Sequence, residues 1–389
     1  MRFGIQILSL KPDSVGGQDV FIRRLLTHLV PQLEGDRLVL FIRPEVAAES
    51  PFKDLAANGF VELVIETPEL HYGRDFARWN LNLLGRARLD CIYFPLFFFY
   101  PRPLPIPVVI HVPDLQHGYF PEYFSPDQLA WRRERIPASV ELANAVITYT
   151  HFSARCLIDK LGADSRKLHV ISAGGFPEEQ TKREVPEPPS VVRPIGSHPF
   201  IYYPAADWPH KNHETLLRAV AMLAQRGRPE RLVLTGMLSQ RGDVLRALIG
   251  KLGLSDRVHL LGCVPQETVI HLYRTASLMA FPSRFEGFGL PLVEAMQLGC
   301  PIVASKAEAV METAGSAAVF CDDNAETWAR ELGRLLSDPA MLADLRTRGL
   351  ERAADFDCHH CAARHLALFR DLASPRHTAK PASTSVRSF

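Results

Sequence analysis

Two glutamates stand eight positions apart in the segment "PSRFEGFGLPLVEAMQLGCPIVAS", residues 282–305. Glu286 falls in a glycine-rich loop after an apolar run, and Glu294 falls inside a short helical pattern. Proline is favoured at the first helical position and glycine just past the last, so we expect a helix that begins at Pro291 and ends before Gly299. The pattern therefore predicts Glu294 in the first turn of a helix and Glu286 at the carboxyl end of the preceding strand.

Such an arrangement suits the binding of a diphosphate that joins two sugars. Gly287 and Gly289 let the backbone approach a ligand closely, and the N–H groups at a helix start favour an anion. A carboxylate near that helix start accepts hydrogen bonds from paired hydroxyls, as the acidic residue of a dinucleotide-binding fold does with ribose. We therefore predict that Glu294 binds a ribose and that Glu286 faces the group beyond the phosphates. The alternative is that Glu286 is a surface charge and Glu294 complements the helix dipole.

A cation candidate lies in another loop between a strand and a helix. Lys211 follows the apolar run "FIYYPA" in the segment "ADWPHKNHETLL". A lysine at this place neutralises the charge of a leaving diphosphate, although a solvated lysine at a helix start is the ordinary alternative.

The first half of the chain carries a second group of candidates. His111 ends the apolar run "PVVIH", and Asp114 and His117 follow it; a lone histidine there is as often structural as catalytic. Gly16 and Gly17 precede the first helical pattern, where a glycine pair permits close approach to a phosphate or an acceptor, or simply forms a tight turn.

The elements that must position these residues alternate between apolar runs of strand length and helical patterns, which predicts parallel sheets between helices. The alternation occurs in two series, separated by a stretch rich in proline and charge at 176–199. We therefore predict an α/β fold of two doubly wound Rossmann-like domains facing a central cleft. The expected parts are a first domain at 1–178, a linker at 179–198, a second domain at 199–356, a helix at 357–372 that crosses back to the first domain, and a disordered tail at 373–389.

Composition narrows the function classes. The 389 residues exceed one ordinary core, and 44 Lys and Arg against 43 Asp and Glu predict no bulk attraction to nucleic acid. Seven scattered cysteines predict free thiols in the cytoplasm, and "CHHC" at 358–361 lacks a second ligand pair, which favours a helix end over a metal site. Five prolines in the apolar stretch 91–110 favour a strand and loop over a membrane helix. The short apolar run at the N-terminus predicts a buried strand rather than a signal peptide.

Taken together, these residues resemble the retaining glycosyltransferases of the GT-B fold, in group 1 or family 4, whose hallmark is two glutamates separated by seven residues. "EGFGLPLVE" from Glu286 to Glu294 matches that hallmark. The resemblance implies that Glu286 contacts the donor sugar and Glu294 the ribose of the nucleotide. It also implies that the backbone amides of Phe288, Gly289 and Leu290 hold sugar and phosphate oxygens.

The same resemblance extends to the walls of the donor site. It supports Lys211 as the cation at the diphosphate, since "HKNH" fits the family's lysine-bearing loop. Many relatives carry an arginine about six residues earlier, where this chain has Ala205. His210 and Arg284 are the candidate substitutes. The nucleotide base would lie against the strand ends that carry the residues Thr235, Gly236 and Val264.

For the acceptor side, the resemblance implies that His111 reaches the donor sugar, with Asp114 and His117 lining the acceptor side. In the family the glycine pair, here Gly16 and Gly17, borders the cleft from the acceptor domain. The first domain is then the acceptor-binding domain and the second the nucleotide-sugar-binding domain.

The expected function is transfer of a hexose, with retention, from a nucleoside-diphosphate sugar to a hydroxyl of a glycan or lipid-linked acceptor in polysaccharide or glycoconjugate biosynthesis. Mannose from GDP-mannose is mildly preferred, and no metal or other cofactor is expected. The alternatives are a sugar-nucleotide epimerase or hydrolase on the same fold, and a non-catalytic subunit that binds nucleotide sugars. We expect no nucleic-acid partner and a cytoplasmic protein, with transient association at the inner membrane face left open.

Overall fold

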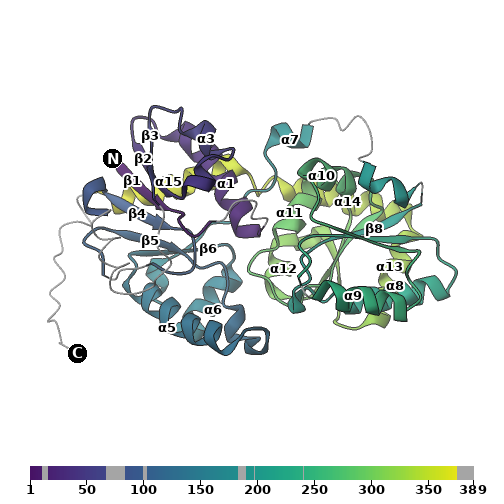
Figure 1. Ribbon diagram of the computed structural model, residues 1–389. Coiled ribbons are helices and arrows are strands. Elements are labelled where there is room, and N and C mark those ends of the chain that lie inside the picture. Colours follow the sequence, from purple (N-terminus) through teal and green to yellow (C-terminus); the bar gives the residue numbers. More distant parts are fainter. Residues whose placement is uncertain are drawn as a thin grey trace.

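The computed structural model describes residues 1–10, 16–66, 84–99, 103–182, 190–196, 198–239 and 241–374. Figure 1 shows two lobes, each built from a sheet between helices. The strands in both sheets are parallel to their neighbours. The predicted fold of two Rossmann-like domains is therefore confirmed.

The first domain contains a seven-stranded sheet in the order β3-β2-β1-β4-β5-β6-β7. Its core strands are apolar on both faces because helices cover both. α1 and α15 pack on one face, and α5 and α6 on the other. The bounds are β1 (Arg2–Gln6), α1 (Gly17–Leu29), β2 (Arg37–Ile42), α2 (Pro44–Ala47), α3 (Phe52–Leu55), β3 (Val61–Ile65), β4 (Cys91–Phe94), β5 (Val108–His111), α5 (Pro126–Leu142), β6 (Ala145–Thr148), α6 (His151–Leu161) and β7 (Leu168–Val170).

The second domain contains a six-stranded sheet in the order β10-β9-β8-β11-β12-β13. The strand order reverses between β8 and β11, and ligands of doubly wound sheets bind at the carboxyl ends of such a pair. The bounds are β8 (Phe200–Pro204), α8 (His213–Gln225), β9 (Arg231–Thr235), α9 (Arg241–Lys251), β10 (Val258–Gly262), α10 (Gln266–Thr275), β11 (Leu278–Phe281), α11 (Leu290–Gln297), β12 (Ile302–Ser305), α12 (Glu308–Ala314), β13 (Ala318–Cys321), α13 (Ala325–Leu336) and α14 (Pro339–Ala353).

The connection between the domains contains more regular structure than its composition predicts. The helix α7 (Glu178–Lys182) opens it, and a 3-10 segment (Ser190–Ile195) precedes β8. Residues 183–189 and 197 lie outside the described ranges, as do residues 375–389 of the predicted disordered tail at 373–389. In the part of the chain that is described, no helix combines the length and apolarity needed to cross a membrane.

The last helix, α15 (Cys358–Leu372), returns to the first domain and lies beside α1 (Figure 1). Its Phe369 ring packs 5.9 Å from the ring of Phe3 and 5.3 Å from that of Tyr93, between centroids. The two crossings between domains also touch each other, since the amide of Gly175 donates to the carbonyl of Phe356 at 3.2 Å. The helix α15 therefore completes the core of the first domain.

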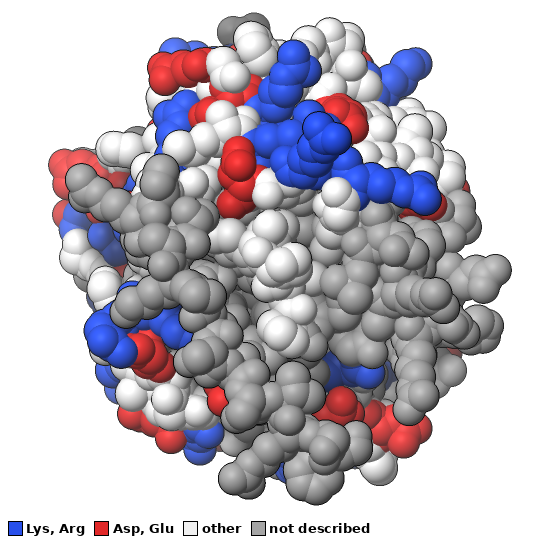
Figure 2. Space-filling model, turned by 90° about the vertical axis from the view of Figure 1, so that its left-hand side faces the viewer, with Lys and Arg blue, Asp and Glu red and all other residues white. Residues whose placement is uncertain are grey.

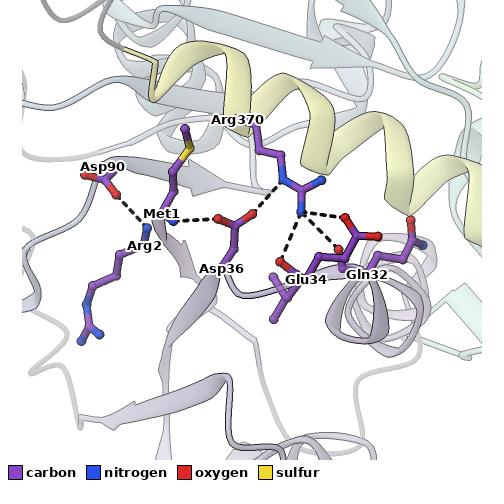
Figure 3. A network of polar contacts seen from close by, with 8 residues as sticks. Met1, Arg2, Gln32, Glu34, Asp36, Asp90 and Arg370 are labelled. Carbon is purple, nitrogen blue, oxygen red and sulfur yellow. Dashed lines mark hydrogen bonds and ion pairs between the residues drawn. The ribbon is translucent and has the colours of Figure 1, made fainter.

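A polar network ties α15 to the sheet edge (Figure 3). Arg370 Nε lies 2.7 Å from Asp36, whose other oxygen lies 2.7 Å from the Met1 amino group. Arg370 also donates to the Leu33 carbonyl at 3.2 Å. Burial alone raises the pKa of Asp36, but the hydrogen bonds from the Met1 amino group and Arg370 outweigh it and leave the pKa below its ordinary value. Asp36 is therefore ionised near neutral pH.

The described residues on the outer face of the first domain carry charges of both signs. Figure 2 shows Lys and Arg side chains gathered toward the top of this face, with Asp and Glu side chains among them. This intermixing agrees with the balanced composition of the chain.

We predict that Arg370→Met lowers the urea midpoint by an amount equivalent to about 1 kcal/mol, because charge-assisted hydrogen bonds at the α15 contact are lost. Because the pKa of Asp36 is lower in the folded chain than in the unfolded chain, ionised Asp36 stabilises the fold at pH values above the unfolded-state pKa. This stabilisation is lost as the pH falls through the folded-state pKa. Arg370→Met should therefore cost most at pH 7 and little at strongly acidic pH. Urea titrations followed by circular dichroism at several pH values measure both effects.

Arg246→Met is the matched control, because Arg246 forms an ion pair with Asp243 in which the two side chains are 59% and 88% exposed. Exposed pairs contribute little, so this variant should keep the wild-type midpoint. Equal midpoint losses in the two variants would contradict the tethering role of Arg370.

Candidate functional site

Two loops of the second domain meet at the switch point between β8 and β11. Lys211 ends a 3-10 turn after β8, and Glu286 follows β11. Lys211 Nζ lies 2.5 Å from Glu286 Oε1, with the two side chains 17% and 12% exposed. The Tyr203 hydroxyl donates to the Lys211 carbonyl at 2.7 Å and fixes the first loop. Because neighbouring parallel strands end at the same edge, the fold brings these distant residues together.

The charge state of this pair follows from its surroundings. Burial raises the pKa of Glu286, but the charge and hydrogen bond of Lys211, with His210 and Ser283, bring it below its ordinary value. The pKa of His210 falls to about 4, chiefly through burial and then through the charge of Lys211. At neutral pH the site thus holds an ionised Glu286, a cationic Lys211 and a neutral His210.

The residues suggested as substitutes for an arginine at Ala205 are committed elsewhere or uncharged. Arg284 Nε lies 2.7 Å from Asp323 Oδ2, and its amide donates to the His210 carbonyl at 2.8 Å. Asp323 also accepts a hydrogen bond from Asn212. Arg284 therefore braces the loop that carries Glu286, and His210 supplies no positive charge.

The helix α11 begins one residue earlier than its sequence pattern predicts. Gly289 is the N-cap, with a φ of 94°, and Leu290 is the first helical residue, so Pro291 is second. Glu294 consequently lies in the second turn, and the prediction of the first turn is wrong. Within the described ranges, no acceptor binds the N–H groups of Phe288, Gly289 and Leu290. The helix start therefore presents backbone donors, as an anion site requires.

Glu294 is buried, with 9% of the residue exposed. Its carboxylate has two partners that the sequence analysis did not predict. Its Oε1 lies 2.7 Å from Arg24 Nη2, across the domain boundary. Its Oε2 accepts a hydrogen bond from the Tyr273 hydroxyl at 3.2 Å. The helical periodicity of α1 could have indicated that Arg24 is buried, because Arg24 falls among the apolar residues of its buried stripe.

Gly287 is a point of close approach between the domains. A Cβ atom added to Gly287 would lie 2.2 Å from the backbone carbonyl oxygen of Pro113. The Thr150 hydroxyl donates to the Gly287 carbonyl at 2.9 Å. Next to it, the Phe288 ring packs 5.4 Å from that of Tyr149. The sequence assigns this glycine to a close ligand, whereas here the close neighbour is the backbone of the first domain.

His111 lies fully buried under this contact. Its Nδ1 is 2.8 Å from the Tyr93 hydroxyl, and its ring lies 4.3 Å from that of Tyr149 and 5.2 Å from that of Phe21. Its Nε2 is buried without a hydrogen-bond partner among the described residues. Burial, and secondarily His365, holds the pKa of His111 well below its ordinary value, so the ring is neutral.

Asp114 and His117 follow His111 in the loop after β5. Burial raises the pKa of Asp114, which also feels the charges of Glu286 and Lys211. His117 is buried, and burial with Arg132 lowers its pKa to about 4. The structure therefore brings Asp114 into the electrostatic range of the Lys211–Glu286 pair.

The glycine pair and the predicted base pocket are less defined. Gly16 is the N-cap of α1 and Gly17 its first residue, while residues 11–15 of the preceding loop lie outside the described ranges. The Thr235 side chain is buried against the Tyr202 hydroxyl at 2.8 Å, so only its backbone can face a ligand. Gly236 has a φ of 128° and lies against the backbone of Ala205. Val264, the remaining predicted pocket residue, is half-buried after β10.

Another interdomain contact involves Glu312, to which the sequence analysis assigns no role. Its carboxylate accepts hydrogen bonds from the amides of His151 and Phe152 at 2.6 and 2.9 Å. An anion at the start of α6 is stabilised by the helix dipole. Among described residues no group of three potential ligands forms a metal cluster, and Cys358 of the "CHHC" motif is the first residue of α15.

Comparisons with known proteins agree across both domains. Residues 15–175 match the family model "Glycosyltransferase Family 4", and residues 191–352 match "Glycosyl transferases group 1". O-antigen chain mannosyltransferase B of Escherichia coli is 26% identical over 79% of this chain and 80% of the relative. The MMP alpha-(1->4)-mannosyltransferase of Mycolicibacterium hassiacum is 33% identical over 58% of this chain and 53% of the relative.

Solved structures show the same fold. HepE of Anabaena, in complex with UDP and glucose, superposes with a TM-score of 0.74 at 20% identity, covering 95% of this chain and 100% of that chain. WaaG, a glycosyltransferase involved in lipopolysaccharide biosynthesis, superposes with a TM-score of 0.72 at 15% identity, covering 94% and 99%. With both domains matched and the glutamate pair placed at the switch point, the chain belongs to the group 1, family 4 glycosyltransferases of the GT-B fold.

Proposed function

We propose that this glycosyltransferase moves a hexose from a nucleoside-diphosphate sugar to a hydroxyl of a glycan or lipid-linked acceptor, with retention of anomeric configuration. The observation that carries the proposal is the Lys211–Glu286 pair, at 2.5 Å, beside a helix start whose first amides have no acceptor in the described chain. A cation, an ionised carboxylate and backbone donors at one strand edge match a diphosphate with a sugar attached.

In the proposed reaction, Lys211 and the amides at the start of α11 stabilise the negative charge that develops on the leaving diphosphate. Glu286 accepts hydrogen bonds from the donor sugar and keeps its anomeric carbon in place. The acceptor oxygen forms a bond to that carbon on the face from which the diphosphate departs, and a phosphate oxygen takes the acceptor proton. Because Lys211 supplies positive charge at the phosphates, we propose that transfer proceeds without a metal ion.

Two residues of the first domain complete the proposal. His111 presents a neutral ring whose buried Nε2 has no described partner, and we assign it to a hydroxyl of the donor sugar. Asp114 lies within the influence of Lys211 and Glu286, and we assign it to the acceptor hydroxyl.

The donor proposed first is GDP-mannose. Two relatives carry the names of mannosyltransferases, and they support mannose as the sugar. The fold neighbour HepE was solved with UDP and glucose, which makes UDP-glucose the comparison donor.

We predict different consequences for the two glutamates. Glu286→Gln should lower kcat by about 100-fold or more while the dissociation constant for the nucleotide stays within about twofold, because a transition-state interaction is lost. Glu294→Gln should raise the nucleotide dissociation constant about tenfold, since charged hydrogen bonds to the ribose are weakened. Initial-rate kinetics and calorimetric titration with the nucleoside diphosphate measure the two effects. Glu308→Gln, at an exposed glutamate, is the control, and wild-type turnover in both site variants would overturn the assignments.

We predict a pH effect from Lys211. Lys211 lowers the pKa of Glu286, so Lys211→Met should raise that pKa and shift the acidic limb of the activity profile to higher pH. Lys211→Arg retains a cation and should keep the limb near its wild-type position. The measurement is kcat/KM between pH 4 and 8. If the acidic limb of Lys211→Met stays at its wild-type pH, Lys211 does not set the pKa of Glu286.

The donor is tested by thermal shift. The panel consists of GDP-mannose, UDP-glucose and UDP-N-acetylglucosamine. A ligand stabilises the folded chain only if it binds, and the stabilisation is about 2.7 kcal/mol at a concentration 100 times the dissociation constant. We expect GDP-mannose to raise the midpoint most. An unchanged midpoint with the whole panel would count against a nucleotide-sugar donor.

A further inference from the structure

A buried ion pair joins the two domains next to the expected ribose site. Arg24 belongs to α1, yet its guanidinium reaches α11 of the second domain, with Nη2 2.7 Å from Glu294 Oε1. Both residues are 9% exposed. A buried carboxylate needs a compensating charge, because removing one partner of such a pair leaves the other desolvated and unpaired. Arg24 is thus the cation that compensates the buried carboxylate of Glu294.

The geometry around Glu294 leaves acceptor capacity unused. An ionised carboxylate has about four lone-pair positions. Arg24 takes one on Oε1, and the hydroxyl of Tyr273 takes one on Oε2 at 3.2 Å. The two contacts fix the plane of the carboxylate and leave a position on each oxygen. Paired hydroxyls of a ribose need two such positions side by side.

The surroundings of Arg24 fix its position as well. Its Cζ lies 4.6 Å from the centroid of the Phe176 ring, and that ring lies 6.4 Å from the ring of Tyr273. Phe176 is held in turn by Gln297, which accepts a hydrogen bond from the Phe176 amide at 2.6 Å. Since Phe176 belongs to the first crossing between the domains, Arg24 is anchored where the domains are joined.

One nitrogen of Arg24 remains unused. Nη1 is buried, and no described residue accepts a hydrogen bond from it. A buried donor without a partner is costly, and a guanidinium with no acceptor at one nitrogen is suited to a ligand oxygen. Nη1 and Nη2 belong to one planar guanidinium group. A ligand hydroxyl that donates a hydrogen bond to Glu294 Oε1 therefore places its oxygen within reach of Nη1.

We propose that Arg24 is a positioning residue of the donor site, which orients the Glu294 carboxylate and donates from Nη1 to a hydroxyl oxygen of the ribose that Glu294 binds. The proposal rests on the proposed function, in which Glu294 holds a ribose. Its new element is that the acceptor domain supplies part of the nucleoside site. Nucleotide binding then favours the closed arrangement of the domains, because Arg24 and Glu294 come from different domains.

The test compares nucleotides that differ only in the ribose. GDP and UDP, with their 2′-deoxy and 3′-deoxy counterparts, are titrated calorimetrically into the full chain and its variants. The wild type should bind a ribonucleotide about tenfold or more tightly than at least one deoxy counterpart. Arg24→Met should weaken the ribonucleotide about tenfold and the deoxynucleotide much less, so that the discrimination between them disappears. Arg24→Lys keeps a cation for Glu294 but lacks the second nitrogen, and should show reduced discrimination.

Arg155→Met is the matched control. Arg155 also forms an interdomain ion pair, with Glu308 at 2.8 Å, but the two side chains are 56% and 59% exposed. It should retain wild-type affinity and discrimination. Melting curves of all variants verify folding, and Arg24→Lys carries the test if Arg24→Met folds poorly.

The outcomes separate the two hypotheses. If the Arg24 variants lose affinity equally for ribose and deoxyribose nucleotides, Arg24 is only a bridge between domains and the inference is overturned. Unchanged affinities in these variants overturn it too. If the wild type binds neither GDP nor UDP, the proposed function fails first, and the assignment of Arg24 fails with it.

Discussion

The architecture of the site depends on the need to compensate buried carboxylates. Glu286 and Glu294 are both largely removed from water, and each lies against one cation, Lys211 and Arg24 respectively. An unpaired charge at such depth would cost several kcal/mol, so the loops and helices that bring these cations must be held firmly. The supports found around the site, such as the hydroxyl of Tyr203 on the Lys211 loop, serve that end.

The two cations come from different places, and this difference separates their roles. Lys211 belongs to the same domain as Glu286, so their pairing survives any movement of the domains relative to each other. Arg24 belongs to the opposite domain, so its pairing with Glu294 exists only when the domains are together. The contact of Gly287 with the backbone of Pro113 makes the same demand, since it leaves no room for a side chain. If Glu294 binds the ribose as proposed, closure of the domains and assembly of the nucleoside site are one event.

Much of the fold was predictable because apolar runs alternate regularly with helical patterns, and parallel sheets place successive loops at one edge. The same reasoning predicts that Lys211 and Glu286 lie in one site, and the structure places them in contact. Contacts across domains were not predictable, because no local pattern reveals that Arg24 meets Glu294 or that Glu312 caps α6. The start of α11 was misplaced by one residue, since Pro291 is tolerated at the second position as well as the first.

The return of α15 to the first domain affects how the chain is made. A ribosome releases β1 and α1 long before α15, so Phe3 and Tyr93 must wait for Phe369 while the whole second domain is synthesised. The second domain, from β8 to α14, is one continuous segment of the sequence and does not wait for a distant helix. During translation the nascent first domain therefore exposes an apolar face, which makes it the half of the molecule with the greater need of chaperone protection.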